Sequence, residues 1–345
     1  MRNFSLWCDY ISRDFLLNGE FDELLKSGVI TGVTTNPAIF KEALSSPTYA
    51  EQKASFAKKN AKKLYEILAA SDVKLAAQKM LALYAKSLAE EQNAEGFVSF
   101  EISPALSFLN KASFAEAKKL FAAVKMPNVM VKIPATPQGL KAAEKLVASG
   151  ISVNATLVFS HKQTSQCVKA FEKGTRRFLK KFPHCPPPEC VVSIFVSRFD
   201  RALNAKCRQL GLPLNEFGVK NAIYCYNLIE KSALKNVRTL FASTGAEGVN
   251  KLNTQLGEPP LCKDYYINAL LLPHTINTAP LSALKAFVQR KTHEFVTLPS
   301  EEELNKFFVK MQPAVEYDAL CEQLLSDGLE AFERAFSEIL KSVKR

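Results

Sequence analysis

The sequence has no hydrophobic run that approaches the roughly 18 apolar residues of a membrane-spanning helix. The N-terminus lacks the basic segment and the long apolar segment of a secretory signal, and instead contains Asp9 and Asp14. The eight cysteines are scattered and form no CxxC pair, which is typical of a reducing compartment and not of a disulfide framework. These absences predict a cytoplasmic protein with no membrane partner.

Cofactor motifs are also missing. No glycine-rich dinucleotide or phosphate-loop fingerprint occurs among the 13 glycines, so no nucleotide cofactor is indicated. The nearest approach to a metal cluster is HCPPPEC at residues 184–190, whose spacing matches no zinc pattern. Its three prolines favour an extended surface connection. The sequence therefore predicts no cofactor and no metal.

The chain is basic, with a formal net charge of +11. Two clusters of lysine and arginine, within residues 58–63 and 176–181, have the spacing of solvated helix faces. Neither interleaved aromatic residues nor a known reading motif accompanies them, so nucleic acid is not an expected partner. A positive field also favours small phosphorylated substrates. Charge alone does not decide between nucleic acid and such substrates. A monomer and a homodimer are equally compatible with the sequence.

Strand-like and helix-like segments alternate along the 345 residues without a low-complexity linker. We expect strands at residues 4–9, 30–35, 96–102, 128–134, 150–158, 190–197, 238–243 and 265–271. Helical patterns fill the intervals, for example at residues 114–124, 139–149 and 219–232. This alternation predicts an α/β fold, a closed (β/α)8 TIM barrel that forms one domain over residues 1–345. We expect extra helices in residues 50–90 and an amphipathic tail, 301–344, that packs across the barrel.

Lys132 lies inside the apolar run VMVKIP at residues 129–134, which reads as a buried parallel strand. Burial disfavours the charged form of an amine, so a lysine there either pairs with a carboxylate or gives up its proton. A neutral amine can attack a carbonyl and form a Schiff base. The alternative is a lysine at a strand end that reaches solvent or pairs with an acid.

Polar side chains stand near the carboxyl ends of the other predicted strands. Taken singly, each suits a turn, a helix cap or a solvated edge. Together they predict a polar, ionisable mouth at the end of a βα-barrel where catalytic residues gather. They are Asp9, Asn36, Glu101, Asn154, Thr156, Ser193, Arg198 and Ser243.

Two long segments resemble the signatures of the transaldolase family: GVTTNPAIF at 32–40 and VMVKIPATPQGL at 129–140. Shorter motifs follow in family order, namely VSFE at 98–101, VNATL at 153–157 and SIFVSR at 193–198. The opening LWCDYISR at 6–13 resembles a subgroup of bacterial transaldolases. The resemblance covers most of the chain and implies a cofactor-free class I aldol mechanism on sugar phosphates, in the pentose phosphate pathway.

The resemblance implies the catalytic roles. Lys132 would form the Schiff base with the C2 carbonyl of a ketose phosphate. Asp9 would take the C4 hydroxyl proton when the C3–C4 bond breaks, and return it in the reverse step. Glu101 would shuttle protons through a water that Thr156 and Ser193 help to position.

The resemblance also implies the substrate contacts. Asn36 and Asn154 would hold the hydroxyls of the dihydroxyacetone unit, and Arg198 and Ser243 would bind phosphate. The chain departs from the pattern after that serine. Many relatives carry a second cation a few positions later, but STGAEG at 243–248 has none. Backbone N–H groups of this loop, Lys251 or Arg13 are candidate replacements.

Two alternatives remain open. The related fructose-6-phosphate aldolases release free dihydroxyacetone, but they tend to carry Gln where Glu101 stands and Tyr where Phe195 stands. Both positions favour the transferase. A barrel that only binds polyanions through its basic surface would show salt-sensitive binding and no reaction at Lys132.

Overall fold

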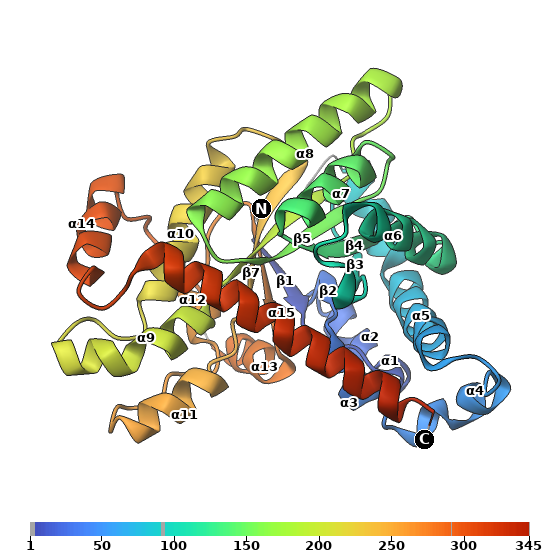
Figure 1. The fold of residues 1–345 in the computed structure, drawn as a ribbon, viewed down its shortest axis with the longest axis horizontal. Helices are drawn as coiled ribbons and strands as arrows, with labels where there is room; N and C mark the ends of the chain where they lie inside the picture. Colours follow the sequence, from blue (N-terminus) through green and yellow to red (C-terminus); the bar gives the residue numbers. More distant parts are fainter. Residues whose placement is uncertain (1–3, 91–93, 291, 345) are drawn as a thin grey trace.

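The computed structural model describes residues 4–90, 94–290 and 292–344, and in these residues eight parallel strands close into a barrel (Figure 1). Each strand pairs with the next in the chain, and β8 pairs with β1 to complete the ring. The strands are β1 Phe4–Cys8, β2 Gly32–Thr34, β3 Phe97–Glu101, β4 Val129–Pro134, β5 Val153–Val158, β6 Cys190–Phe195, β7 Val237–Ala242 and β8 Thr275–Ala279. The predicted (β/α)8 fold is therefore confirmed.

The position predicted for the eighth strand is wrong. Residues 265–271 contain helix α12 (Tyr265–Ala269), and the strand follows it at Thr275–Ala279. Aromatic and β-branched residues gave the segment a strand-like composition. Its buried residues, however, include Tyr266, Ile267 and Leu270, which are spaced as on one face of a helix. Tertiary packing of that face decided the conformation.

Helices fill the connections between strands and extend beyond the barrel. They are α1 Arg13–Leu17, α2 Glu20–Lys26, α3 Pro37–Ala43, α4 Ala50–Ser55, α5 Ala61–Ala89, α6 Asn110–Val124, α7 Pro137–Val147, α8 His161–Lys181, α9 Ser197–Leu210, α10 Phe217–Glu230, α11 Glu247–Gln255, α13 Leu281–Gln289, α14 Glu301–Met311 and α15 Tyr317–Ser342, with short 3₁₀ turns η1 Pro47–Tyr49 and η2 Pro104–Leu106. The extra helices expected in residues 50–90 are α4 and α5.

Side-chain caps start the helices that follow β2, β4 and β5. Asn36, Thr136 and Ser160 each accept a hydrogen bond from a backbone N–H of the first turn. Pro37 and Pro137 occupy the first helical position, where a missing N–H costs nothing. These local signals end each strand sharply and hold its last residues at the rim of the barrel.

Packed side chains fill the barrel below its carboxyl-terminal rim. Apolar side chains from six strands belong to one buried cluster, namely Trp7, Phe97, Met130, Val191, Leu240 and Ile276. Gly32 pairs with Trp7, and a Cβ at Gly32 would lie only 2.3 Å from the indole ring. Deeper still, the buried Arg238 forms an ion pair with Glu95 at 3.0 Å. Side chains from most of the strands therefore occupy the interior below the rim, and the polar residues of the candidate site lie at the rim above them.

Helix α15 crosses the carboxyl-terminal end of the barrel, as expected for the tail, and it runs diagonally over the strands in Figure 1. It packs against α3, α5, η2 and β5. A Cβ at Gly328 would lie 2.9 Å from a Leu157 methyl group and 3.0 Å from Nη1 of Arg198. The absence of a side chain at Gly328 thus allows α15 to approach the site.

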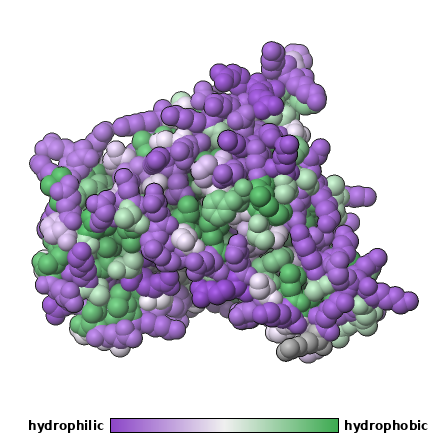
Figure 2. Space-filling view, viewed as in Figure 1, coloured by the Kyte–Doolittle hydropathy of each residue, from purple (hydrophilic) through white to green (hydrophobic). Residues whose placement is uncertain are grey.

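Hydrophilic side chains cover much of the face seen in Figure 2, and apolar patches interrupt them. No helix in the described part of the chain is long and apolar enough to cross a membrane.

Candidate active site

Lys132 occupies the middle of β4 and points into the barrel, as does Met130 two residues earlier. It pairs in register with Glu101 of β3 and Asn154 of β5, so the three residues lie at one level. The residue is only 5% exposed, and its Nζ donates a hydrogen bond to the Thr35 carbonyl oxygen at 3.0 Å. It forms no ion pair with any residue that the structure describes. A lysine that snorkels to solvent or is neutralised by a salt bridge is therefore excluded.

Asp9 follows β1 at the same rim and is partly buried. Its Oδ1 accepts a hydrogen bond from the Thr34 hydroxyl at 2.7 Å, and that hydroxyl also lies 2.6 Å from the Thr278 hydroxyl. Burial raises the pKa of the Asp9 carboxyl, while Lys132 and the Thr34 hydrogen bond oppose the increase. Asp9 is thus held near Lys132 in a setting that favours proton uptake.

Glu101 ends β3 with only 5% of the residue exposed. Neither carboxylate oxygen has a hydrogen-bond partner among the residues described. Burial raises the pKa of Glu101 to about 7; Lys132 lowers it and Asp9 raises it. A carboxyl group that titrates near neutrality can both give and take a proton, which is the property needed for general acid–base catalysis.

Three polar side chains form a chain across the barrel at this level. The Ser193 hydroxyl donates to Oδ1 of Asn154 at 2.6 Å, and Nδ2 of Asn154 donates to the Ser99 hydroxyl at 3.1 Å. These contacts fix the orientation of the Asn154 amide. Thr156 is fully buried, and its hydroxyl has no partner in the described residues. An unsatisfied hydroxyl in this position is available to a water or a substrate.

The side chain of Asn36 has a structural role of its own. Its Oδ1 caps α3 by accepting a hydrogen bond from the Ile39 N–H at 3.1 Å. The residue remains partly exposed at the rim. The cap uses the oxygen and leaves the two N–H groups of the amide for another acceptor.

Arg198 lies at the start of α9, at the corner between the ends of β6 and β7. Its guanidinium carbon is 5.1 Å from the centre of the Phe195 ring, and it forms no ion pair within the described residues. Burial, with a smaller contribution from Arg201, lowers the pKa of Arg198 to about 10, and Asp327 of α15 opposes the decrease. The Ser197 and Ser243 hydroxyls lie 3.1 Å apart in this corner. An anion such as phosphate would satisfy the unpaired cation.

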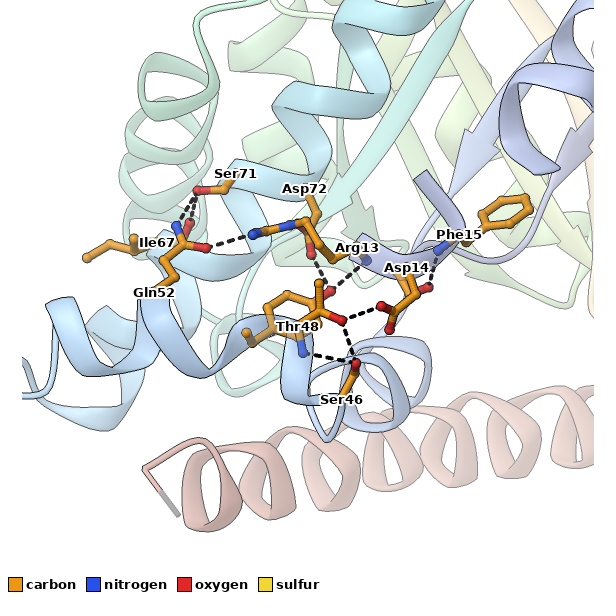
Figure 3. Close-up of polar contacts among 11 residues, drawn as sticks. Arg13, Asp14, Phe15, Ser46, Thr48, Gln52, Ile67, Ser71 and Asp72 are labelled. Atoms are coloured by element: carbon orange, nitrogen blue, oxygen red, sulfur yellow. Dashed lines mark hydrogen bonds and ion pairs between the residues drawn. The ribbon is translucent and has the colours of Figure 1, made fainter. Parts of the chain in front are cut away.

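Arg13 makes its contacts elsewhere, with Asp72 and Gln52 (Figure 3). Its Nε pairs with the buried carboxylate of Asp72 on α5, and its Nη2 donates to Oε1 of Gln52 at 2.8 Å. Tyr49 also donates to Asp72, at 2.6 Å, and its ring stacks under the guanidinium. The suggestion that Arg13 supplies a second cation for phosphate is therefore wrong, because the side chain is already neutralised outside the barrel.

The sequence did not reveal the residues that support the site. Thr34 holds Asp9, the Thr35 carbonyl receives Lys132, and Ser99 fixes Asn154. All three lie within the strand segments that the sequence singled out. Ser99 alternates with the buried Val98 and Phe100, and this alternation was an available signal for an inward-facing side chain. Thr35 contributes only its backbone carbonyl, which no side-chain pattern marks.

Together these features define a (β/α)8 barrel whose site is built around a buried lysine that forms no ion pair with the described residues. Residues 6–343 match the model of the family described as Transaldolase/Fructose-6-phosphate aldolase. A protein named Transaldolase from Campylobacter jejuni subsp. jejuni serotype O:23/36 (strain 81-176) is 43% identical over 99% of this chain and 100% of its own length. A protein with the same name from Helicobacter pylori (strain P12) is 37% identical, again over 99% of this chain and 100% of its own length. The chain belongs to the transaldolase/fructose-6-phosphate aldolase family.

Proposed function

We propose that this chain is a transaldolase that transfers a dihydroxyacetone unit between sugar phosphates. The donor is a ketose phosphate, sedoheptulose 7-phosphate or fructose 6-phosphate, and the acceptor is glyceraldehyde 3-phosphate or erythrose 4-phosphate. The observation that carries the proposal is the buried Lys132, which lacks an ion-pair partner in the described residues and lies level with Glu101. This reaction belongs to the non-oxidative pentose phosphate pathway. The eight free cysteines suit a reducing cytoplasm, where we place it.

The first half of the reaction forms the Schiff base. The neutral Lys132 amine attacks the C2 carbonyl and gives a carbinolamine, which loses water to become a protonated imine. Glu101 supplies the proton for the departing hydroxyl through a water and recovers it later, a role supported by its pKa of about 7. The unpartnered Thr156 hydroxyl and the Ser193 hydroxyl would position that water.

The second half breaks and remakes a carbon–carbon bond. Asp9 takes the proton of the C4 hydroxyl, the C3–C4 bond breaks, and its electron pair moves into the imine to form an enamine. The aldose phosphate leaves. Asn154, oriented by Ser193 and Ser99, and Asn36 hold the hydroxyls of the three-carbon unit until an acceptor aldehyde arrives. Attack by the enamine on that aldehyde then reverses each step.

The phosphate group would occupy the corner between α9 and the loop after β7. Arg198 supplies the main cationic contact, because its guanidinium is unpaired within the described residues and held over the Phe195 ring. Ser243 would donate its hydroxyl from the neighbouring loop. The loop that follows strand 7 is a common phosphate position in (β/α)8 enzymes. An Arg198→Ala variant with an unchanged apparent affinity for fructose 6-phosphate would contradict this assignment.

The proposal is tested by trapping the imine with borohydride in the presence of fructose 6-phosphate. Intact mass and peptide mapping should show a reduced dihydroxyacetone adduct on Lys132 that is absent from Lys132→Ala. A folded protein without an adduct on any lysine would remove the aldol mechanism and favour the polyanion-binding alternative. Turnover that proceeds without an aldose phosphate acceptor would instead identify the lyase activity of a fructose-6-phosphate aldolase.

A further inference from the structure

The phosphate corner contains a second guanidinium group. Arg201 lies three residues after Arg198 on α9, so both side chains leave the same face of the helix. Arg201 is exposed, and it forms neither a hydrogen bond nor an ion pair with any residue in 4–90, 94–290 or 292–344. The positive charges of Arg198 and Arg201 repel each other, and an anion bound between them would relieve that repulsion.

The path of the Arg201 side chain leads toward the loop that contains Ser243. A Cβ at Gly248, in the first turn of α11, would lie 3.5 Å from both Cδ and Nη1 of Arg201. Gly248 is five residues after Ser243, and the Ser243 carbonyl oxygen accepts a hydrogen bond from the Ser197 N–H at 3.0 Å. Arg201 therefore reaches from α9 to the first turn of α11, which directly follows the loop that contains Ser243. Burial is the main cause of the lowered pKa of Arg198, and the charge of Arg201 adds to it.

We propose that Arg201 is the second cation of the phosphate site and acts with Arg198 on the phosphate of donor and acceptor sugars. This inference rests on the proposed function. Between Ser243 and Gly248, the first residue of α11 is Glu247, which is acidic. Its carboxylate accepts a hydrogen bond from the Ser282 hydroxyl at 2.8 Å. The cation that the loop lacks thus comes from the adjacent helix.

Three variants test the assignment: Arg201→Gln, Arg201→Lys and Lys251→Gln. Lys251, an exposed cation on α11, is the rival candidate that the sequence offered for the same role, and its loss removes the same single charge. Loss of a hydrogen bond to a charged group predicts that kcat/KM for fructose 6-phosphate falls by about tenfold in Arg201→Gln. Arg201→Lys should keep most of the activity, and Lys251→Gln should match the wild type.

Borohydride trapping with free dihydroxyacetone separates this inference from the proposed function, because that ketone has no phosphate. Arg201→Gln should trap it on Lys132 as well as the wild type does. If the wild type transfers but Arg201→Gln keeps its kcat/KM, or if Arg201→Lys loses as much as Arg201→Gln, the role of Arg201 is refuted. The role of Arg201 is also refuted if kcat/KM falls in Lys251→Gln but not in Arg201→Gln. If the wild type forms no adduct with fructose 6-phosphate, the proposed function itself fails.

Discussion

Replacing Glu101 with glutamine should raise stability and lower activity together. The pKa of Glu101 is about 7 against an ordinary 4.5, so the unfolded chain releases this proton more readily than the folded protein. Below pH 4.5 the group is protonated in both states and costs nothing; above pH 7 its buried charge costs roughly 3 kcal/mol, since one pKa unit is about 1.4 kcal/mol. Stability therefore falls as the pH rises from 4.5 to 7. Glutamine keeps the size, stays neutral and removes that cost.

The assay is urea unfolding of the wild type and of Glu101→Gln at about pH 5 and pH 8, values on either side of the Glu101 pKa. The stability advantage of the variant should be about 2–3 kcal/mol greater at the higher pH. Its transfer rate should fall by about 10²–10⁴, as expected for loss of a general acid–base group. Glu302→Gln is the control, because the Glu302 side chain is 76% exposed. An advantage that is the same at both pH values would refute the buried, titrating carboxyl group.

Other substitutions test packing and the position of the phosphate corner. Gly32→Ala should lower the melting temperature, since overpacking against the tryptophan ring costs about 1–3 kcal/mol. Gly328→Ala should raise the KM for fructose 6-phosphate, because the new methyl group crowds Arg198. Borohydride trapping of dihydroxyacetone, which has no phosphate, should change less. Asp72→Ala should destabilise the fold by about 3 kcal/mol in urea unfolding, because it leaves Arg13 unpaired. An increased KM in folded Asp72→Ala would contradict our placement of Arg13 outside the site.

Local sequence patterns were sufficient to locate most of the strands. The run around Lys132 is apolar and closed by proline, so it could be read as a buried strand without any knowledge of its neighbours. Tyr265 and Tyr266 show the limit of this approach, because their strand-like composition belongs to a helix that tertiary packing stabilises. The assignment of the chain to one domain, and its oligomeric state, stay predictions.

The candidate site was less accessible to sequence reasoning. The residues at strand ends could be named because parallel strands share one rim. The ion pair of Arg13 could not be predicted, since its partner Asp72 is 59 residues away on another helix. Arg201 was overlooked for a similar reason. Its significance depends on its contact with Gly248, which only the folding of α9 against α11 creates.

The position of α15 in the chain has a consequence for biosynthesis. All eight strands, and therefore Lys132, Asp9 and Glu101, leave the ribosome before the helix that carries Gly328. A nascent barrel can form its lysine-centred pocket early, but the wall beside Arg198 and Leu157 is added only after residue 328 has emerged. Recognition of phosphorylated sugars should thus mature later in translation than imine chemistry.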